Sequence, residues 1–303
     1  MELNSIALNL DLDKALCSSL YEVFYVKDEN VVLPEFLNLH IKRDEFARHC
    51  DYIGLGSARE YCRFANIADF DIKIPPIEVQ REIVKADRLI KRRIRLNDQM
   101  IQKLEATAQA LYRKMFIDGI DKENLPEGWR MGTLGEVADC FDYMRRPLAG
   151  YDRIDMEKKY PYFGAATLMD FVDDYLFDGT YILMGEDGTV INEDYTPVIQ
   201  YVTGKFWVNN HAHILKGKNG FNENLLYLAL KQTKVTEFIT GGVQAKINQE
   251  NMMSIPLIIP TMNDIKEITT NIEPLFHSQL VKKQENEKLT ELQSLLLARM
   301  GYN

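Results

Sequence analysis

Residues 66–84, NIADFDIKIPPIEVQREIV, resemble residues 251–269, NMMSIPLIIPTMNDIKEIT, so the chain contains an internal repeat. The two stretches align without a gap at an offset of 185 residues, the spacing of Pro75 and Pro260. Further identical pairs keep the same offset: Gly56 with Gly241, Glu82 with Glu267, Ile83 with Ile268, Leu104 with Leu289, Leu111 with Leu296 and Met115 with Met300. One constant offset over about 60 residues is hard to produce by chance and indicates two copies of one structural plan.

Each copy predicts a short strand followed by a long helix. The apolar runs at 72–76 (IKIPP) and 257–260 (LIIP) end in proline, which cannot continue a strand's hydrogen-bond ladder. After the first run, apolar residues recur at heptad spacing around Asn97, until Gly119 ends the pattern. The apolar positions are Ile83, Ile90, Ile94, Ile101, Leu104, Ala108, Leu111 and Met115. We therefore expect one helix across 77–120.

The second helix is expected from about residue 263 to residue 300. Its matching positions are Leu275, Gln279, Lys282, Asn286, Leu289, Gln293, Leu296 and Met300. Because the centre of this seam is polar, the helix would pair poorly with itself, and antiparallel pairing with the first helix is expected. Helices of this length would span on the order of 55 Å and act as a spacer. The alternative is an ordinary helical bundle.

The region between the helices reads as β-rich. Candidate strands lie at 160–168, 180–186, 196–202, 205–210 and 211–216, with turn signals at 178–179, 187–188 and 217–218. A helix is expected over 222–240, with Asn222 as its N-cap. Residues 5–56 resemble the end of such a unit, with a strand at 20–26 and a helix at 34–50. Applying the repeat offset to Leu125 places the opening of this first unit about 60 residues before Met1, so the unit is expected to be truncated.

Several classes of protein are excluded by composition. No apolar run reaches about 18 residues, so no membrane span is expected. Residues 1–14 lack the basic start and apolar core of a secretory signal. The four cysteines lack CxxC spacing and predict neither a zinc site nor a disulfide framework, which suits a reducing cytoplasm. They are Cys17, Cys50, Cys62 and Cys140.

The charge of the chain is unevenly distributed. The formal net charge of −9 argues against nucleic-acid binding, because neutralising phosphates needs a basic surface. Basic stretches nevertheless exist: residues 88–95 read RLIKRRIR, and residues 205–246 contain six lysines against two acidic residues. The local distribution decides whether a groove or patch is basic. The 88–95 run is either a solvated helix face or a docking surface for a partner or the DNA backbone.

No catalytic or cofactor-binding set emerges. The amino-methyltransferase motif [DN]PP[YFW] is missing, and the loop 185–188 lacks the GK[ST] of a phosphate-binding loop. His211 and His213 lie two apart on an expected strand and face the same side, but no third ligand is near in sequence. We expect no metal site, and hydrogen bonding near a DNA face or in the core instead.

Five segments resemble the specificity subunit of type I restriction-modification systems. They are LPEGWRMGTLGEV (125–137), the stretch 162–190, NNHAHIL (209–215), QAKINQENMMSIPLIIP (244–260) and the stretch 56–84. Each segment alone is moderately specific, but together they follow the family's order and cover nearly the whole chain. The resemblance implies a protein that recognises double-stranded DNA and is not itself an enzyme.

The resemblance also implies an α+β fold, in which β-rich target recognition domains are joined by two long conserved helices that form an antiparallel coiled coil. The boundaries we expect are 1–76 for the end of a first recognition domain, 77–120 for the central helix, 121–260 for the second recognition domain and 261–303 for the distal helix. Each recognition domain would read one half of a bipartite target in the prokaryotic cytoplasm.

The implied partners are modification (methyltransferase) subunits and restriction (translocase) subunits. S-adenosylmethionine, ATP and Mg²⁺ would belong to those partners, and none is expected in this chain. The expected truncation leaves two alternatives open: a half-type or silent-cassette protein that acts by forming a homodimer, and a coiled-coil scaffold with no DNA role.

Residues expected to contact DNA lie in loops and at strand ends. Arginine can bind guanine or phosphate, glutamine suits adenine, lysine suits phosphate, and small residues allow close backbone approach. The candidates are Arg145, Arg146, Gly164, Ala165, Thr167, Lys205, Asn210, His211, Gln244, Lys246 and, in the first copy, Arg59 at the place of Gln244.

Overall fold

A computed structural model describes residues 6–10, 12–18, 21–54, 64–242 and 244–300 of this chain. The chain forms two compact units, one made of 1–101 with 281–303 and the other of 102–280. The long helices α4 (Ile77–Phe116) and α8 (Met262–Arg299) each contribute one part to each unit. The expected pair of long helices and the mixed α and β content are confirmed.

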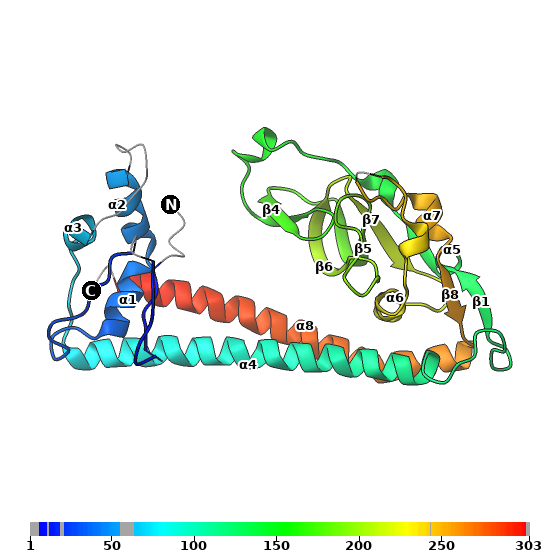
Figure 1. Ribbon diagram of the computed structural model, residues 1–303, viewed down its shortest axis with the longest axis horizontal. Coiled ribbons are helices and arrows are strands. Elements are labelled where there is room, and N and C mark those ends of the chain that lie inside the picture. Colours follow the sequence, from blue (N-terminus) through cyan, green and yellow to red (C-terminus); the bar gives the residue numbers. More distant parts are fainter. Residues whose placement is uncertain (1–5, 11, 19–20, 55–63, 243, 301–303) are drawn as a thin grey trace. The chain divides into compact units, whose positions relative to one another are not determined.

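Within the first unit the two long helices run antiparallel (Figure 1). The two ends of this contact run in opposite directions along the helices: Asp87 bonds Gln293, whereas Asn97, ten residues further along α4, bonds Asn286. Arg93 bonds Glu285, the neighbour of Asn286. The eight positions expected to form the seam of α8 are all buried or half-buried. On α4 Asp87 is also buried at the seam, where it accepts from Gln293, and Gln80 is buried against residues 31–33; an apolar pattern could reveal neither.

The remaining described residues of the first unit form short helices and segments without regular secondary structure. The helix expected at 34–50 is two helices, α1 (Pro34–Ile41) and α2 (Asp44–Gly54), and α3 (Phe64–Ala68) follows. Phe36 and Leu39 of α1 pack on Val84 of α4. The strand expected at 20–26 was wrong, because residues 21–26 form no regular element and no described segment of this unit pairs with them.

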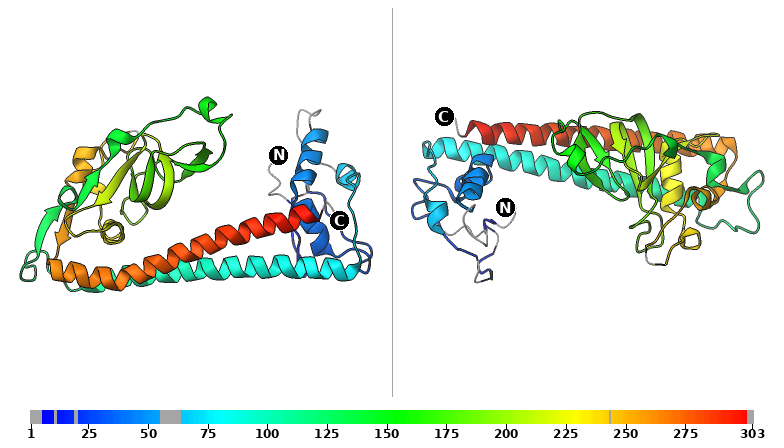
Figure 2. Two further views of the ribbon diagram at one scale, coloured as in Figure 1. Left: turned by 180° about the vertical axis from the view of Figure 1, so that it is seen from behind. Right: turned by 90° about the horizontal axis from the view of Figure 1, so that it is seen from above.

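The second unit contains two sheets (Figures 1 and 2). In the smaller, β1 (Arg130–Thr133) pairs antiparallel with β8 (Pro256–Ile259). The larger has six strands in the order β2-β7-β5-β6-β3-β4, and only the β3–β6 pairing is parallel. Its strands are β2 (Ala138–Cys140), β3 (Tyr160–Phe163), β4 (Leu168–Val172), β5 (Phe177–Gly185), β6 (Ile199–Val208) and β7 (Ala212–Gly217).

One strand replaces two expected ones. The runs 196–202 and 205–210 form the single strand β6, because Gly204 adopts a φ of 86° without leaving the ladder. It lies opposite Gly179 of β5, so the turn expected at 178–179 was also wrong. Gly179 and Gly204 therefore lie at a distortion inside the β5–β6 hairpin and not at the turn that ends it.

The core of the second unit includes the long helices. Ala108, Tyr112 and Phe116 of α4 and Ile265 and Ile268 of α8 share one cluster with the sheet and the short helices. The short helices and helical turns are α5 (Leu134–Val137), α6 (Glu223–Lys231), α7 (Gln249–Met253), η2 (Asp142–Met144), η3 (Tyr151–Arg153) and η4 (Thr236–Phe238). This part of the α4–α8 pair is therefore an integral layer of the domain.

The N-cap expected for α6 is confirmed, since Asn222 accepts a hydrogen bond from the Leu225 backbone at 2.9 Å. The helix ends at Lys231, well before the expected residue 240. Within the described part of the chain, no helix is both long and apolar enough to cross a membrane.

Candidate nucleic-acid interface

Glu186, immediately after β5, is the centre of a charged network in the second unit. Its Oε2 lies 2.5 Å from Nη1 of Arg145, and its Oε1 lies 3.1 Å from Nζ of Lys246. Burial alone would raise the pKa of Glu186, but hydrogen bonds from Arg145 and Lys246 hold this pKa below its ordinary value. The carboxylate therefore stays ionised and orients two cations.

Arg145 is bound on all sides within the domain. Its guanidinium donates to the backbone carbonyls of Asn210 at 3.3 Å and Ala212 at 2.9 Å, besides its contact with Glu186. It also lies 3.3 Å from a carboxylate oxygen of Asp142, and its side chain is only 15% exposed. Arg145, expected to contact DNA directly, is placed here to fix the start of β7.

His213 is the buried member of the network. Its Nδ1 lies 2.5 Å from Oδ2 of Asp142, and its Nε2 lies 2.8 Å from the carbonyl oxygen of Ile247. The other oxygen of Asp142 accepts the backbone N–H of Ile214 at 3.0 Å. The expectation that His213 serves hydrogen bonding is confirmed.

The same residues do not suit a metal ion. Ligand atoms of Cys140, Asp142 and His213 lie within 4.8 Å of one another. Two ligands about 2.0 Å from a tetrahedral zinc would be about 3.3 Å apart, whereas Nδ1 of His213 and Oδ2 of Asp142 are 2.5 Å apart. Burial raises the pKa of the Cys140 thiol to about 12, which opposes the thiolate that a metal needs.

An exposed rim surrounds this network. His211 is about half exposed, and its Nδ1 lies 2.7 Å from Oδ1 of Asp187. Lys246 is similarly exposed, and its backbone exchanges two hydrogen bonds with that of Thr240, at 2.7 and 2.8 Å. Several of the residues expected to contact DNA are exposed near the ends of these strands and loops. They are Arg146, Thr167, Asn210, His211, Gln244 and Lys246.

Glycine shapes the loop that carries Gln244. Gly241 adopts a φ of 92°, and a Cβ there would lie 2.2 Å from the carbonyl oxygen of Gln244. No side chain fits at that position, so the tight return that presents Gln244 and Lys246 depends on glycine.

The turn after β3 lies against the end of β5. Gly164 donates its N–H to the carbonyl of Thr167 at 2.9 Å, and Gln200 donates to the carbonyl of Gly164 at 3.0 Å. A Cβ on Gly185 would lie 3.4 Å from the carbonyl oxygen of Ala165. The structure therefore brings Gly164 and Ala165 close to Glu186, although Gly164 itself is buried.

Two other predicted residues lie elsewhere. Lys205 pairs in register with Asp178, near the opposite end of β5, and its ammonium lies 4.4 Å from the centre of the Tyr175 ring. Arg59 lies outside the described residues. Sequence reasoning missed Asp142, Glu186 and Asp187. Asp142 lies three residues before the predicted Arg145, but Glu186 is 41 residues from Arg145 and Asp187 is 24 residues from His211, so closeness in sequence pointed to Asp142 alone.

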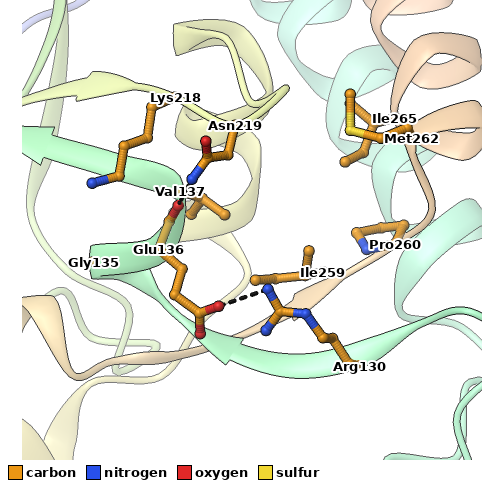
Figure 3. Close-up of a pocket in the computed structure, with 10 residues that line it drawn as sticks. All are labelled: Arg130, Gly135, Glu136, Val137, Lys218, Asn219, Ile259, Pro260, Met262 and Ile265. Atoms are coloured by element: carbon orange, nitrogen blue, oxygen red, sulfur yellow. Dashed lines mark hydrogen bonds and ion pairs between the residues drawn. The ribbon is translucent and has the colours of Figure 1, made fainter.

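A separate cavity of about 380 Å³ lies between β1, β8 and the start of α8 (Figure 3). Arg130 and Glu136 form an ion pair at 2.6 Å within its lining, and Lys218 is 2.8 Å from Asp139. Because its charged groups neutralise one another, the cavity offers no unpaired charge to a ligand. It shares no lining residue with the Glu186 network.

Comparison with known proteins identifies the family to which a chain with this architecture belongs. The family model described as "Type I restriction modification DNA specificity domain" matches residues 6–106 and 126–291. The chain belongs to this family. A putative type I restriction enzyme specificity subunit of Haemophilus influenzae is 34% identical over 157 residues, covering 50% of this chain and 39% of the relative.

A second relative in that organism, the type I restriction enzyme HindI specificity subunit, is 31% identical over 110 residues, covering 36% of this chain and 24% of the relative. The matched segments thus span well under half of either relative. The crystal structure of a type I restriction-modification S subunit from M. genitalium has a TM-score of 0.53 at 16% identity, covering 91% of this chain and 74% of that one. This likeness supports the fold.

Proposed function

We propose that this chain is the DNA-sequence-recognition and scaffolding subunit of a type I restriction-modification complex and is not an enzyme itself. Family membership supports a role in DNA specificity. The observation that carries the proposal is the rim around Glu186, where exposed Asn210, His211, Gln244 and Lys246 surround internally bonded Arg145. Amide and imidazole groups suit base edges, and lysine suits phosphate.

The acidic net charge does not oppose this proposal, because a DNA contact depends on the side chains that the rim itself exposes. Arg146 and Lys246 are both exposed there. The local distribution of charge, and not the mean over the whole chain, decides whether a surface attracts phosphates.

We propose that α4 also supplies a docking surface for a modification subunit. Lys85 and Arg92 are exposed on one side of the helix, next to Leu89 and Leu96, which are 56% and 45% exposed. At steps of four, three and four residues, Lys85, Leu89, Arg92 and Leu96 follow one another along one face of the helix, so basic and apolar side chains alternate on it. Such a face suits a partner helix that presents both acidic and apolar side chains.

In the complete assembly each recognition domain would read one half of a bipartite target in a prokaryotic cytoplasm. Modification and restriction subunits would bring S-adenosylmethionine, ATP and Mg²⁺, and this chain would bring the sequence preference.

Co-expression with a modification subunit tests the proposal. Methylation mapping should reveal one target sequence that changes when Gln244 or Asn210 is substituted, while the purified chain alone turns over no S-adenosylmethionine. Methylation by the modification subunit that is identical with and without this chain would contradict the proposal.

A second candidate, action through a homodimer, is favoured by the exposed segment 21–26 of the first unit. Tyr21, Val23 and Tyr25 are 53%, 80% and 83% exposed, although their residue types suit a sheet. Pairing of this segment with a second copy would cover them. Light scattering of the isolated chain that gives the dimer mass would favour this candidate, and a strict monomer would oppose it.

A further inference from the structure

Both hydrogen-bond partners of the His213 ring are acceptors. Nδ1 faces a carboxylate oxygen of Asp142 at 2.5 Å, and Nε2 faces the carbonyl oxygen of Ile247 at 2.8 Å. A carbonyl and an ionised carboxylate only accept hydrogen bonds, and a neutral imidazole carries a single N–H. Only the imidazolium satisfies both contacts at once.

The alternative is a proton on Asp142 instead of the ring. Burial favours that neutral form, but the hydrogen bond from His213 and the nearby Arg145 together hold the pKa of Asp142 below its ordinary value. The second oxygen of Asp142 also accepts the backbone N–H of Ile214 at 3.0 Å. Both oxygens therefore act as acceptors.

The charged surroundings of His213 can hold a buried cation. Carboxylates approach its ring from two elements: Asp142 from η2, and Glu186 at 3.9 Å from the end of β5. Arg145 and Lys246 bind those same carboxylates from the outside, and the neutral thiol of Cys140 is adjacent. With His213 charged, three cations face two carboxylates; loss of its proton would leave two against two.

His213 connects this network to the loop proposed to contact DNA. Ile247 donates its N–H to the backbone carbonyl of Glu186 at 2.9 Å and accepts from His213 through its own carbonyl. Both backbone groups of Ile247 are thus fixed, and its side chain is fully buried. The exposed Lys246 and Gln244 precede this anchor by one and three residues.

We propose that His213 is a buried imidazolium that positions the 244–247 loop for DNA binding, an inference that rests on the proposed function. The additional proton gives the ring a second N–H, so that it can bond Asp142 and Ile247 at the same time. It also adds one positive charge to the network around Glu186. Because the protonated form makes both bonds, the contribution is present at lower pH and is lost as the pH rises. DNA affinity should then weaken towards alkaline pH.

The decisive measurement is a histidine ring ¹⁵N–¹H correlation spectrum of the full-length wild-type chain at about pH 7. The ring of His213 should show two N–H groups, and on raising the pH the amide signals of Lys246 and Ile247 should shift at the same midpoint as the ring. One N–H on the ring at about pH 7 would overturn the inference, as would loop amides that ignore the ring's titration.

DNA binding is measured in parallel with a fluorescein-labelled random-sequence duplex at low salt. Wild-type affinity should fall about ten-fold between about pH 6 and about pH 9, whereas His213→Gln should bind about ten-fold more weakly at the lower pH with a flattened profile. His277→Gln, which changes an exposed histidine of α8 outside the proposed DNA-contacting residues, should keep the wild-type profile. A pH-dependent fall that survives in His213→Gln would overturn the positioning role.

The two readouts separate the inference from the proposed function. A wild-type chain that binds no duplex at any pH would contradict the proposed function, while the ring spectrum and the loop amides would still decide the state and anchoring role of His213. Since those spectra need only the wild-type chain, the test does not depend on the folding of His213→Gln.

Discussion

The side-chain amide of Asn97 donates a hydrogen bond of 2.9 Å to the side-chain oxygen of Asn286, across the pairing of α4 and α8 in the first unit. Asn97 is only 3% exposed, and Asn286 in turn donates to Asp98 at 2.8 Å. A buried polar pair in the seam is satisfied in one register only, because a slip leaves the amide of Asn97 unpaired.

Substitution of Asn97 with leucine should therefore reveal coupling with Asn286. Asn97→Leu alone should lower the free energy of unfolding by about 1 kcal/mol, because Asn286 loses a buried partner. Asn97→Leu combined with Asn286→Leu should recover that loss or exceed it, since two leucines pack in the seam. Urea unfolding of the two single variants and the double variant gives the coupling energy, and strictly additive effects would argue against the pair as a register device.

Removing the charge of Glu186 should destabilise the second unit more than removing the charge of an exposed acidic residue does. Glu186→Gln removes the carboxylate charge that Arg145 and Lys246 share. Among the described residues, the buried guanidinium of Arg145 then keeps Asp142 as its one negatively charged partner. We expect a loss of about 3 kcal/mol in the free energy of unfolding. Asp178→Asn, an exposed acid on the same strand, is the matched control and should cost under about 0.5 kcal/mol.

The depressed pKa of Asp142 predicts a specific acid sensitivity. A carboxyl whose pKa is lower in the folded than in the unfolded chain stabilises the fold above its ordinary pKa, and this contribution is lost as the pH falls through the folded value. Wild-type stability should thus fall below about pH 4. Asp142→Asn should be less stable near neutral pH, with a shallower acid dependence, in thermal unfolding followed across the acid range. An unchanged slope would mean that other carboxyls dominate acid unfolding.

The parts of the fold predicted from sequence are those set by local pattern. The heptad positions of α8, from Leu275 to Met300, are buried or half-buried because a 3.6-residue period fixes which side chains share a face. The N-cap of α6 at Asn222 was equally predictable, since capping involves only neighbouring residues.

The features that a local pattern does not reveal depend on partners distant in sequence. Residues 20–26 have strand-forming side chains, but a strand exists only where another strand meets it. Arg145 reads as an exposed loop arginine until Glu186, 41 residues later, is brought beside it. The role of His213 likewise required Asp142 and Ile247, which are 71 and 34 residues away.

Gln244 and Lys246 should contribute to DNA binding in different ways, although they share one loop. Lys246 is about half exposed and held by Glu186 at 3.1 Å, so it can reach a phosphate without a large change of the backbone. Lys246→Ala should weaken binding to all sequences and reduce the slope of log affinity against log salt by about 0.9. Gln244→Ala should leave this slope unchanged and cost about 1–3 kcal/mol at one base position only. Fluorescence anisotropy across a salt series, with the mapped target and single-base variants of it, separates the two effects. Equal binding by both variants and the wild type would leave the loop as a plain connection between η4 and α7.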